Sequence, residues 1–169
     1  GNLEAAKRRG LTAKHFSFNS RGGRCENCEG LGRIVSNMLF FENVETVCPV
    51  CGGRQFNEEV LSVRFKGCSI HEILKQPVEK ALETFGENKK LERILGLLQD
   101  VGLGYLELGQ TLTTLSGGEG QRLKLARELM QNRGKRSLYL IDEPTTGLHP
   151  LDIEHFLVLL NHMVDNGGT

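Results

Sequence analysis

The sequence predicts an α/β fold in which a small cysteine-held β module precedes a mainly helical segment. Three observations support this fold class: two Cys-x-x-Cys pairs lie close together, helical patterns dominate after them, and one late apolar run ends in two carboxylates. We therefore divide the 169 residues into a basic lead-in at 1–24, a cysteine module at 25–66 and a segment of helices with one strand at 67–169.

The composition narrows the class of protein. Lys and Arg total 21, as do Asp and Glu, so net charge by itself indicates no particular partner. No apolar run approaches the roughly 18 residues of a membrane span, and no secretory signal opens the sequence. Five cysteines without such a signal favour a reducing compartment. We expect a cytoplasmic protein with no membrane partner.

The lead-in is locally basic. Seven basic residues lie between Lys7 and Arg33, against only two glutamates. Such a segment can neutralise phosphate groups, and the aromatic rings among its charges could pack on a sugar or base. The alternative is a solvated arm whose charges face water. If this stretch binds nucleic acid, the candidate contacts are Lys14, Arg21, Arg24 and Arg33.

The four candidate metal ligands are Cys25, Cys28, Cys48 and Cys51. They form two Cys-x-x-Cys pairs with 19 residues between the pairs, a spacing that predicts a four-thiolate zinc site. Glycines that let backbone N–H groups approach sulfur follow both pairs, at Gly30, Gly32, Gly52 and Gly53. The alternatives are a dithiol redox pair or inert buried thiols. Cys68 has no such partner and is expected to be a small core residue.

The elements that follow are predicted from local patterns. The apolar, β-branched stretches Arg33–Phe41 and Val60–Phe65 indicate strands. Beyond them, apolar residues recur at three- and four-residue spacing and predict three successive helices. The first ends before Pro77, which suits the first turn of the second helix. Gly86 ends the second helix, and Asn88 can cap the third.

A later helix begins within Leu115–Arg122, whose sequence is LSGGEGQR. Ser116 stands where an N-cap belongs, and the glycines Gly117 and Gly118 allow close approach to the first N–H groups of a helix over about Glu119–Asn132. Such an N-terminus is an anion site suited to the γ-phosphate of a nucleotide. Taken alone, the same residues indicate only a capped helix start.

The apolar run Leu138–Ile141 predicts a buried parallel strand, with Asp142 at the carboxyl end where α/β sheets bind ligands. Asp142 suits a Mg²⁺ contact and Glu143 suits polarising an attacking water. The alternative is a carboxylate pair that serves as a turn and helix cap. No G-x-x-x-x-G-K-[ST] phosphate loop occurs in the sequence. We therefore expect this chain alone not to hydrolyse ATP, because phosphoryl transfer depends on positioning the phosphates.

Two of these segments, LSGGEGQR and LYLIDEPTTGLH, resemble the signature motif, Walker B strand and D-loop of ABC-type ATPases. The stretches FSFNSRGGRCENCEGLG, CPVCGG, KGCSIHEIL and DVGLGYLELGQTLTTLSGGEGQRLKLARELM narrow the resemblance to the UvrA family, the DNA-damage recognition ATPases of bacterial nucleotide excision repair. The resemblance implies an ABC-ATPase partial domain, made of the signature helical subdomain and the Walker B strand of the second ATP-binding half, with an inserted small β zinc module.

The resemblance also implies roles for particular residues. The four paired cysteines match the zinc ligands, and Asp142 and Glu143 match the metal-binding and catalytic carboxylates. The residues that match the signature, which closes on ATP held by the opposite nucleotide-binding domain, are Ser116, Gly117, Gly118 and Glu119. The residues that match the D-loop are Thr146, Gly147, Leu148 and His149. The implied cofactors are structural Zn²⁺, ATP and Mg²⁺.

The implied partners are damaged double-stranded DNA, a second copy of the intact protein and a UvrB-like repair protein. Two alternatives remain at this point. One is a UvrA-like paralogue that acts in antibiotic resistance. The other is a zinc-stapled binding module of the DnaJ kind, because the pattern C-x-x-C-x-G-x-G at residues 25–32 also resembles DnaJ cysteine repeats.

Overall fold

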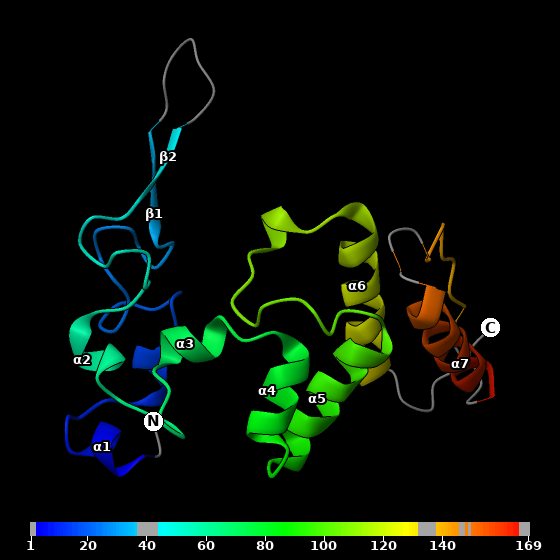
Figure 1. Ribbon diagram of the computed structural model, residues 1–169, viewed down its shortest axis with the longest axis horizontal. Helices are drawn as coiled ribbons and strands as arrows, with labels where there is room; N and C mark the ends of the chain where they lie inside the picture. The colour runs from blue at the N-terminus through cyan, green and yellow to red at the C-terminus, as the bar shows by residue number, and fades with distance from the viewer. Residues whose placement is uncertain (1–2, 37–43, 132–137, 146–147, 149, 166–169) are drawn as a thin grey trace. The chain divides into compact units, whose positions relative to one another are not determined.

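The computed structural model describes residues 3–36, 44–131, 138–145, 148 and 150–165. The chain divides into two compact units, Gly1–Ile73 and Leu74–Thr169 (Figure 1). Each unit is described separately below. Within the described residues, no helix combines the length and apolar character needed to cross a membrane. Part of the predicted strand Arg33–Phe41 and three D-loop candidates, Thr146, Gly147 and His149, lie outside the described residues.

The first unit is built around a two-stranded antiparallel hairpin. Strand β1 (Arg33–Ser36) pairs with β2 (Val44–Val47), with Arg33 opposite Val47 and Ser36 opposite Val44. Ile34 packs against the buried cysteines, whereas every residue of β2 is exposed. A two-stranded hairpin is only marginally stable by itself, so this unit depends on what holds the base of the hairpin together.

The lead-in at 1–24 forms two short helical turns. It contains the helical turn α1 (Glu4–Lys7) and the 3₁₀ turn η1 (Ala13–Phe16). Two parts of the lead-in approach each other closely at Gly23, where an added Cβ would lie 1.8 Å from the backbone oxygen of His15. Since a side chain would overlap backbone atoms, only glycine fits at this position.

The prediction of a strand at Val60–Phe65 is wrong. The short helix α2 (Glu58–Leu61) occupies its first part, because the Asn57 side chain accepts a hydrogen bond from the backbone N–H of Val60 at 2.9 Å. Val60 and Leu61 are buried as apolar residues of a helical turn. The composition suited a strand, but a capping side chain just before the segment selected the helix instead.

The second unit confirms the predicted helices. The short helix α3 (Ile70–Leu74) leads into it and ends before Pro77. Pro77 is the N-cap of α4 (Val78–Phe85), which ends at Gly86. Asn88 caps α5 (Lys89–Asp100) by accepting hydrogen bonds from the N–H groups of Lys90 and Leu91 at 3.1 and 3.2 Å. The shared core of α4 and α5 consists of Val78, Ala81 and Leu95.

The loop after α5 connects these helices to the later part of the unit. Its apolar side chains Val101, Leu103 and Leu106 are buried together with Ala126 of α6 (Gly117–Gln131). The short turn η2 (Leu112–Thr114) then leads to the start of α6. The loop therefore packs against the middle of α6 through apolar contacts. The last element is α7 (Pro150–Asp165).

The segment Leu138–Ile141 does not form the predicted strand. The prediction that it is buried is correct for one side only. Tyr139 and Ile141 pack around Leu125 of α6 and Phe156 of α7. The alternating residues Leu138 and Leu140 are 71% and 90% exposed. A strand buried on both faces needs hydrogen-bonding neighbours and a second covering layer, which the described part of the unit does not supply.

Candidate functional site

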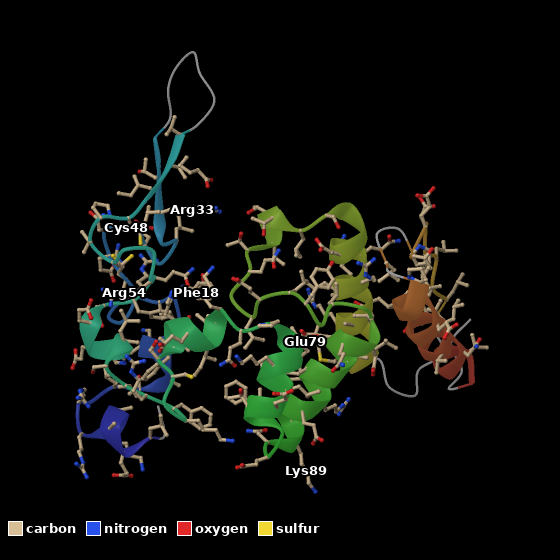
Figure 2. The ribbon with its side chains drawn as sticks, in the orientation of Figure 1. Phe18, Arg33, Cys48, Arg54, Glu79 and Lys89 are labelled. Carbon is tan, nitrogen blue, oxygen red and sulfur yellow. The ribbon has the colours of Figure 1, made fainter. Side chains whose placement is uncertain are left out.

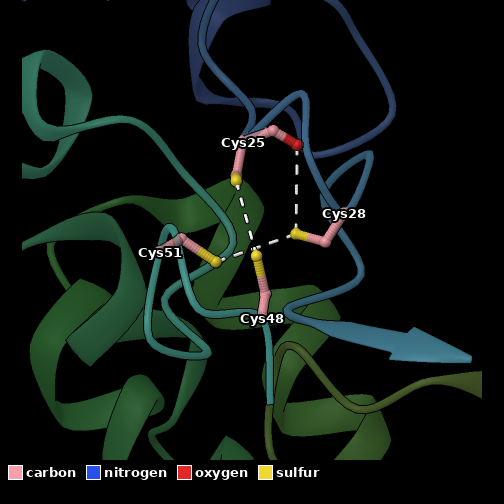
Figure 3. Close-up of side chains that lie close together, drawn as sticks. All are labelled: Cys25, Cys28, Cys48 and Cys51. Atoms are coloured by element: carbon pink, nitrogen blue, oxygen red, sulfur yellow. Dashed lines mark hydrogen bonds between the residues drawn. The ribbon is translucent and has the colours of Figure 1, made fainter. Parts of the chain in front are cut away.

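The four paired cysteines converge on one point in the first unit. All four side chains are buried, and their sulfur atoms lie within 4.8 Å of one another (Figure 3). The Sγ atoms of Cys25 and Cys48 are 3.9 Å apart, and those of Cys28 and Cys51 are 3.7 Å apart. A tetrahedral zinc with 2.3 Å bonds requires sulfur atoms about 3.8 Å apart. The described cysteines therefore fit a tetrahedral thiolate site.

The two Cys-x-x-Cys turns share one backbone conformation. In both, the residues one, two and four positions after the second cysteine have positive φ angles. The values are 51°, 84° and 75° at Glu29, Gly30 and Gly32, and 56°, 83° and 68° at Gly52, Gly53 and Gln55. The predicted role of the glycines is seen directly at Gly32, whose N–H donates to the Cys28 sulfur at 3.2 Å. Both turns thus direct backbone dipoles toward the sulfur cluster.

The thiols of this cluster do not share one electrostatic environment. Hydrogen bonds from the Cys51 backbone and the Asn27 side chain lower the pKa of Cys48 to about 6, although burial opposes this. Burial raises the pKa of Cys51 to about 12, and burial also raises the pKa of Cys28. A bound cation would hold all four as thiolates, because only the deprotonated form is a metal ligand.

The four basic residues predicted to contact DNA differ in exposure and in their ion-pair partners. Lys14 and Arg21 are exposed. Arg24, by contrast, has a side chain only 12% exposed and lies 3.4 Å from Glu26 and 3.6 Å from Glu29. Arg33, labelled in Figure 2, pairs with Glu45 across the hairpin at 2.9 Å. Of these four, Lys14 and Arg21 are therefore the cations that a phosphate could reach without displacing a carboxylate.

The start of α6 is a reciprocal capping box. The Ser116 hydroxyl accepts from the Glu119 N–H at 3.3 Å, and the Glu119 carboxylate accepts from the Ser116 N–H at 2.6 Å. No neighbouring atom lies within 4 Å of the position that a Cβ on Gly117 would take. An approaching anion therefore meets open backbone at the positive end of the helix.

Tyr105 is a part of this arrangement that the sequence did not reveal. Its hydroxyl donates to the second oxygen of the Glu119 carboxylate. This bond and those from Ser116 lower the pKa of Glu119, while burial and the same carboxylate raise the pKa of Tyr105. The Arg122 side chain, one helical turn further along α6, is 1% exposed and adds positive charge close to both groups. The Glu119 carboxylate is thus held from two sides.

Asp142 and Glu143 follow the segment that packs on α6 and α7, and both are exposed. Glu143 has a φ of 42°, a left-handed conformation that is uncommon for a residue with a side chain. Leu148, the one D-loop candidate within the described residues, packs against the cluster of Leu125 and Phe156. The carboxylates are therefore presented at the surface by a segment whose other side is anchored.

Comparisons with known proteins agree with these features. The family model described as ABC transporter matches residues 37–146. UvrABC system protein A of Bacillus subtilis is 52% identical over 164 residues, covering 97% of this chain and 17% of the relative. The Streptomyces avermitilis protein of the same name is 51% identical, with coverages of 97% and 16%. The chain thus spans about a sixth of the length of these relatives.

A solved structure gives the same result for the fold. The crystal structure of UvrA2 from Deinococcus radiodurans superimposes with a TM-score of 0.89 at 46% sequence identity. The match covers 99% of this chain and 21% of the solved chain. Similarity therefore extends through both units, including the cysteine cluster and α6.

Proposed function

Because the chain belongs to the ABC transporter family and is similar to UvrABC system protein A along 97% of its length, we propose that it is part of a UvrA-like ABC ATPase. The intact protein couples ATP binding and hydrolysis to the recognition of damaged DNA in nucleotide excision repair. This chain contributes the signature helix and the Walker B carboxylates of one nucleotide-binding half. These 169 residues contain no G-x-x-x-x-G-K-[ST] phosphate loop, so we assign the phosphate cradle to another part of the intact protein.

The observation that carries this proposal is the open, capped N-terminus of α6. A γ-phosphate that approaches Gly117 and Gly118 meets backbone N–H groups and the Ser116 hydroxyl, at the end of the helix where the dipole favours an anion. The Ser116–Glu119 capping box keeps that end ordered before the nucleotide arrives. In a dimer of nucleotide-binding domains, this surface closes on ATP held by the opposite domain.

Asp142 and Glu143 supply the other half of the chemistry. Asp142 would hold the Mg²⁺ that neutralises the phosphate oxygens, and the Glu143 carboxylate would orient and polarise the attacking water. Both side chains are exposed, so they can reach a nucleotide that is bound by other parts of the intact protein.

The experiment is a comparison of turnover and binding in the intact protein. Glu143→Gln should retain ATP binding and lower turnover by at least about 10²-fold, because the amide keeps the shape but cannot act as a base. Glu92→Gln, an exposed glutamate on α5, serves as the matched control and should leave turnover unchanged. Wild-type turnover by the Glu143→Gln protein, or robust ATP hydrolysis by the 169-residue chain alone, would overturn the assignment.

The four-cysteine cluster is proposed to hold structural Zn²⁺, with Cys25, Cys28, Cys48 and Cys51 as the ligands. The donor set and the sulfur spacing support zinc, which prefers tetrahedral thiolate sites. The metal would join the two ends of the module and fix the base of a hairpin that has little apolar core of its own. We also retain the division into lead-in, zinc module and ATPase segment at 1–24, 25–66 and 67–169.

Damaged double-stranded DNA, a second copy of the intact protein and a UvrB-like repair protein are the proposed partners, and the cytoplasm is the proposed location. Lys14 and Arg21 are the strongest candidates for phosphate contacts because they are exposed. A UvrA-like resistance paralogue and a DnaJ-like binding module are both less well supported. The match of the ABC family model over residues 37–146 favours an ATPase over the DnaJ-like module.

A further inference from the structure

The cysteine cluster is not symmetric in its side-chain surroundings. Asn27 and Val50 occupy the same position in the two Cys-x-x-Cys turns, each just before the second cysteine. The Asn27 amide reaches across to the other turn and donates to the Cys48 sulfur at 3.3 Å. Val50 is 67% exposed, and its side chain has no polar atom that could form a matching bond. This side-chain hydrogen bond therefore links the first turn to a ligand sulfur of the second.

This contact has a defined electrostatic consequence. Four thiolates around a divalent cation leave an excess of two negative charges in a buried site, and such charge is costly unless donors surround it. Backbone N–H groups provide part of the compensation, as Gly32 does for Cys28. Among the described residues, Cys48 is the cysteine whose sulfur accepts from a non-cysteine side chain.

We propose that Asn27 is a positioning residue of the metal centre, which fixes the Cys48 thiolate by hydrogen bonding and thereby tightens the hold on the metal. The inference rests on the proposed zinc site. Outer donors of this kind orient the ligands and tune the metal, and their removal typically lowers metal affinity about 10- to 100-fold. Asn27 itself is exposed, so replacing it should alter the donor without opening a cavity.

The test uses the 169-residue chain loaded with Zn²⁺ or with Co²⁺. The variants are Asn27→Ala, Asn27→Asp, which keeps the shape but cannot donate, and Val50→Ala as the matched control. Zinc affinity is measured by competition with a chelator. The thiolate-to-Co²⁺ charge-transfer absorption is then recorded, because a hydrogen bond stabilises sulfur lone pairs and raises the energy of these bands.

We expect every variant to bind one metal ion per chain. Both Asn27 variants should weaken Zn²⁺ binding about 10-fold or more and move the charge-transfer bands to lower energy, while Val50→Ala matches the wild type. Asn27 variants that match Val50→Ala in affinity and band position would overturn the inference and leave the zinc site standing. A wild-type chain that binds neither metal would overturn the zinc site itself, and the inference with it.

Discussion

Protonation of Glu119 should loosen the start of α6. Its carboxylate accepts from the Ser116 N–H at 2.6 Å and from the Tyr105 hydroxyl, and these bonds, Tyr105 first, hold its pKa below the ordinary 4.5. A carboxyl whose pKa is lowered in the folded state stabilises that state above its unfolded pKa. The contribution is lost as the pH falls through the folded value, so the loss lies below pH 4.5.

The size of the effect follows from the two hydrogen bonds. Bonds to a charged acceptor contribute about 1.5–3 kcal/mol each at buried sites. Glu119 is half-buried, so solvent screening reduces this to about 1 kcal/mol in total, the usual value of a helix cap. We expect Glu119→Gln to lower the free energy of unfolding of the Leu74–Thr169 unit by about that amount at neutral pH. At pH values well below 4.5 the two proteins should be equally stable.

Tyrosine fluorescence provides a direct assay. The chain has no Trp and two Tyr, Tyr105 and Tyr139, both in the Leu74–Thr169 unit. In a Tyr139→Phe background, all of the emission comes from Tyr105. A carboxylate that accepts a hydrogen bond from a phenol quenches its emission, so acidification should raise the signal with a midpoint below pH 4.5. Glu119→Gln should remove this transition, and the control Glu92→Gln should preserve it.

Two outcomes would refute the reasoning. One is a midpoint at or above pH 4.5, which would mean that the hydrogen bonds do not stabilise the charged carboxylate. The other is an unchanged transition in Glu119→Gln, which would assign the fluorescence change to another group.

Two further predictions concern the first unit. Gly23→Ala should destabilise it by about 3 kcal/mol or more, because the new Cβ overlaps backbone atoms that cannot move independently; hydrogen exchange of residues 13–16 and 55–57 measures the loss. In the intact protein, Lys14→Ala with Arg21→Ala should weaken DNA binding on all sequences and reduce the salt dependence by about 0.9 per lost phosphate contact; binding at several salt concentrations measures it.

Matched controls exist for both. Gly96→Ala places its Cβ in open space on α5 and should not lower stability. Wild-type protection in Gly23→Ala would mean that the lead-in does not pack as described. Lys89→Ala with Lys90→Ala removes two exposed charges from α5 and should leave DNA binding unchanged. An equal loss of DNA binding in both double variants would indicate that the lead-in is a solvated arm that makes no specific phosphate contacts.

Local signals predicted much of this fold. The helices around Pro77, Gly86 and Asn88 follow from capping residues and apolar spacing, which act within a few residues along the chain. The cysteine cluster follows from ligand spacing, since a metal site restricts geometry more tightly than propensity does. The composition of Val60–Phe65 predicted a strand, but the Asn57 cap favours a helical turn in the first part of this segment. A prediction from composition alone was therefore wrong there.

Contacts between distant residues were beyond such reasoning. Tyr105 lies 14 positions before Glu119, and no periodic pattern connects a loop tyrosine with a helix-capping carboxylate. The one-sided burial of Leu138–Ile141 depends on packing against α6 and α7, which the sequence of the segment does not specify. Asn27 gave no signal either, because its role depends on the other cysteine turn reaching its amide.

The central claim for the first unit is the metal centre, and one measurement tests it most directly. Elemental analysis of the purified chain, combined with X-ray absorption at the zinc edge, gives both the metal content and its ligands. We predict one zinc ion per chain with four sulfur neighbours at about 2.3 Å. A chain without zinc, a first coordination shell with nitrogen or oxygen in place of sulfur, or a disulfide between Cys25 and Cys28 would contradict the account.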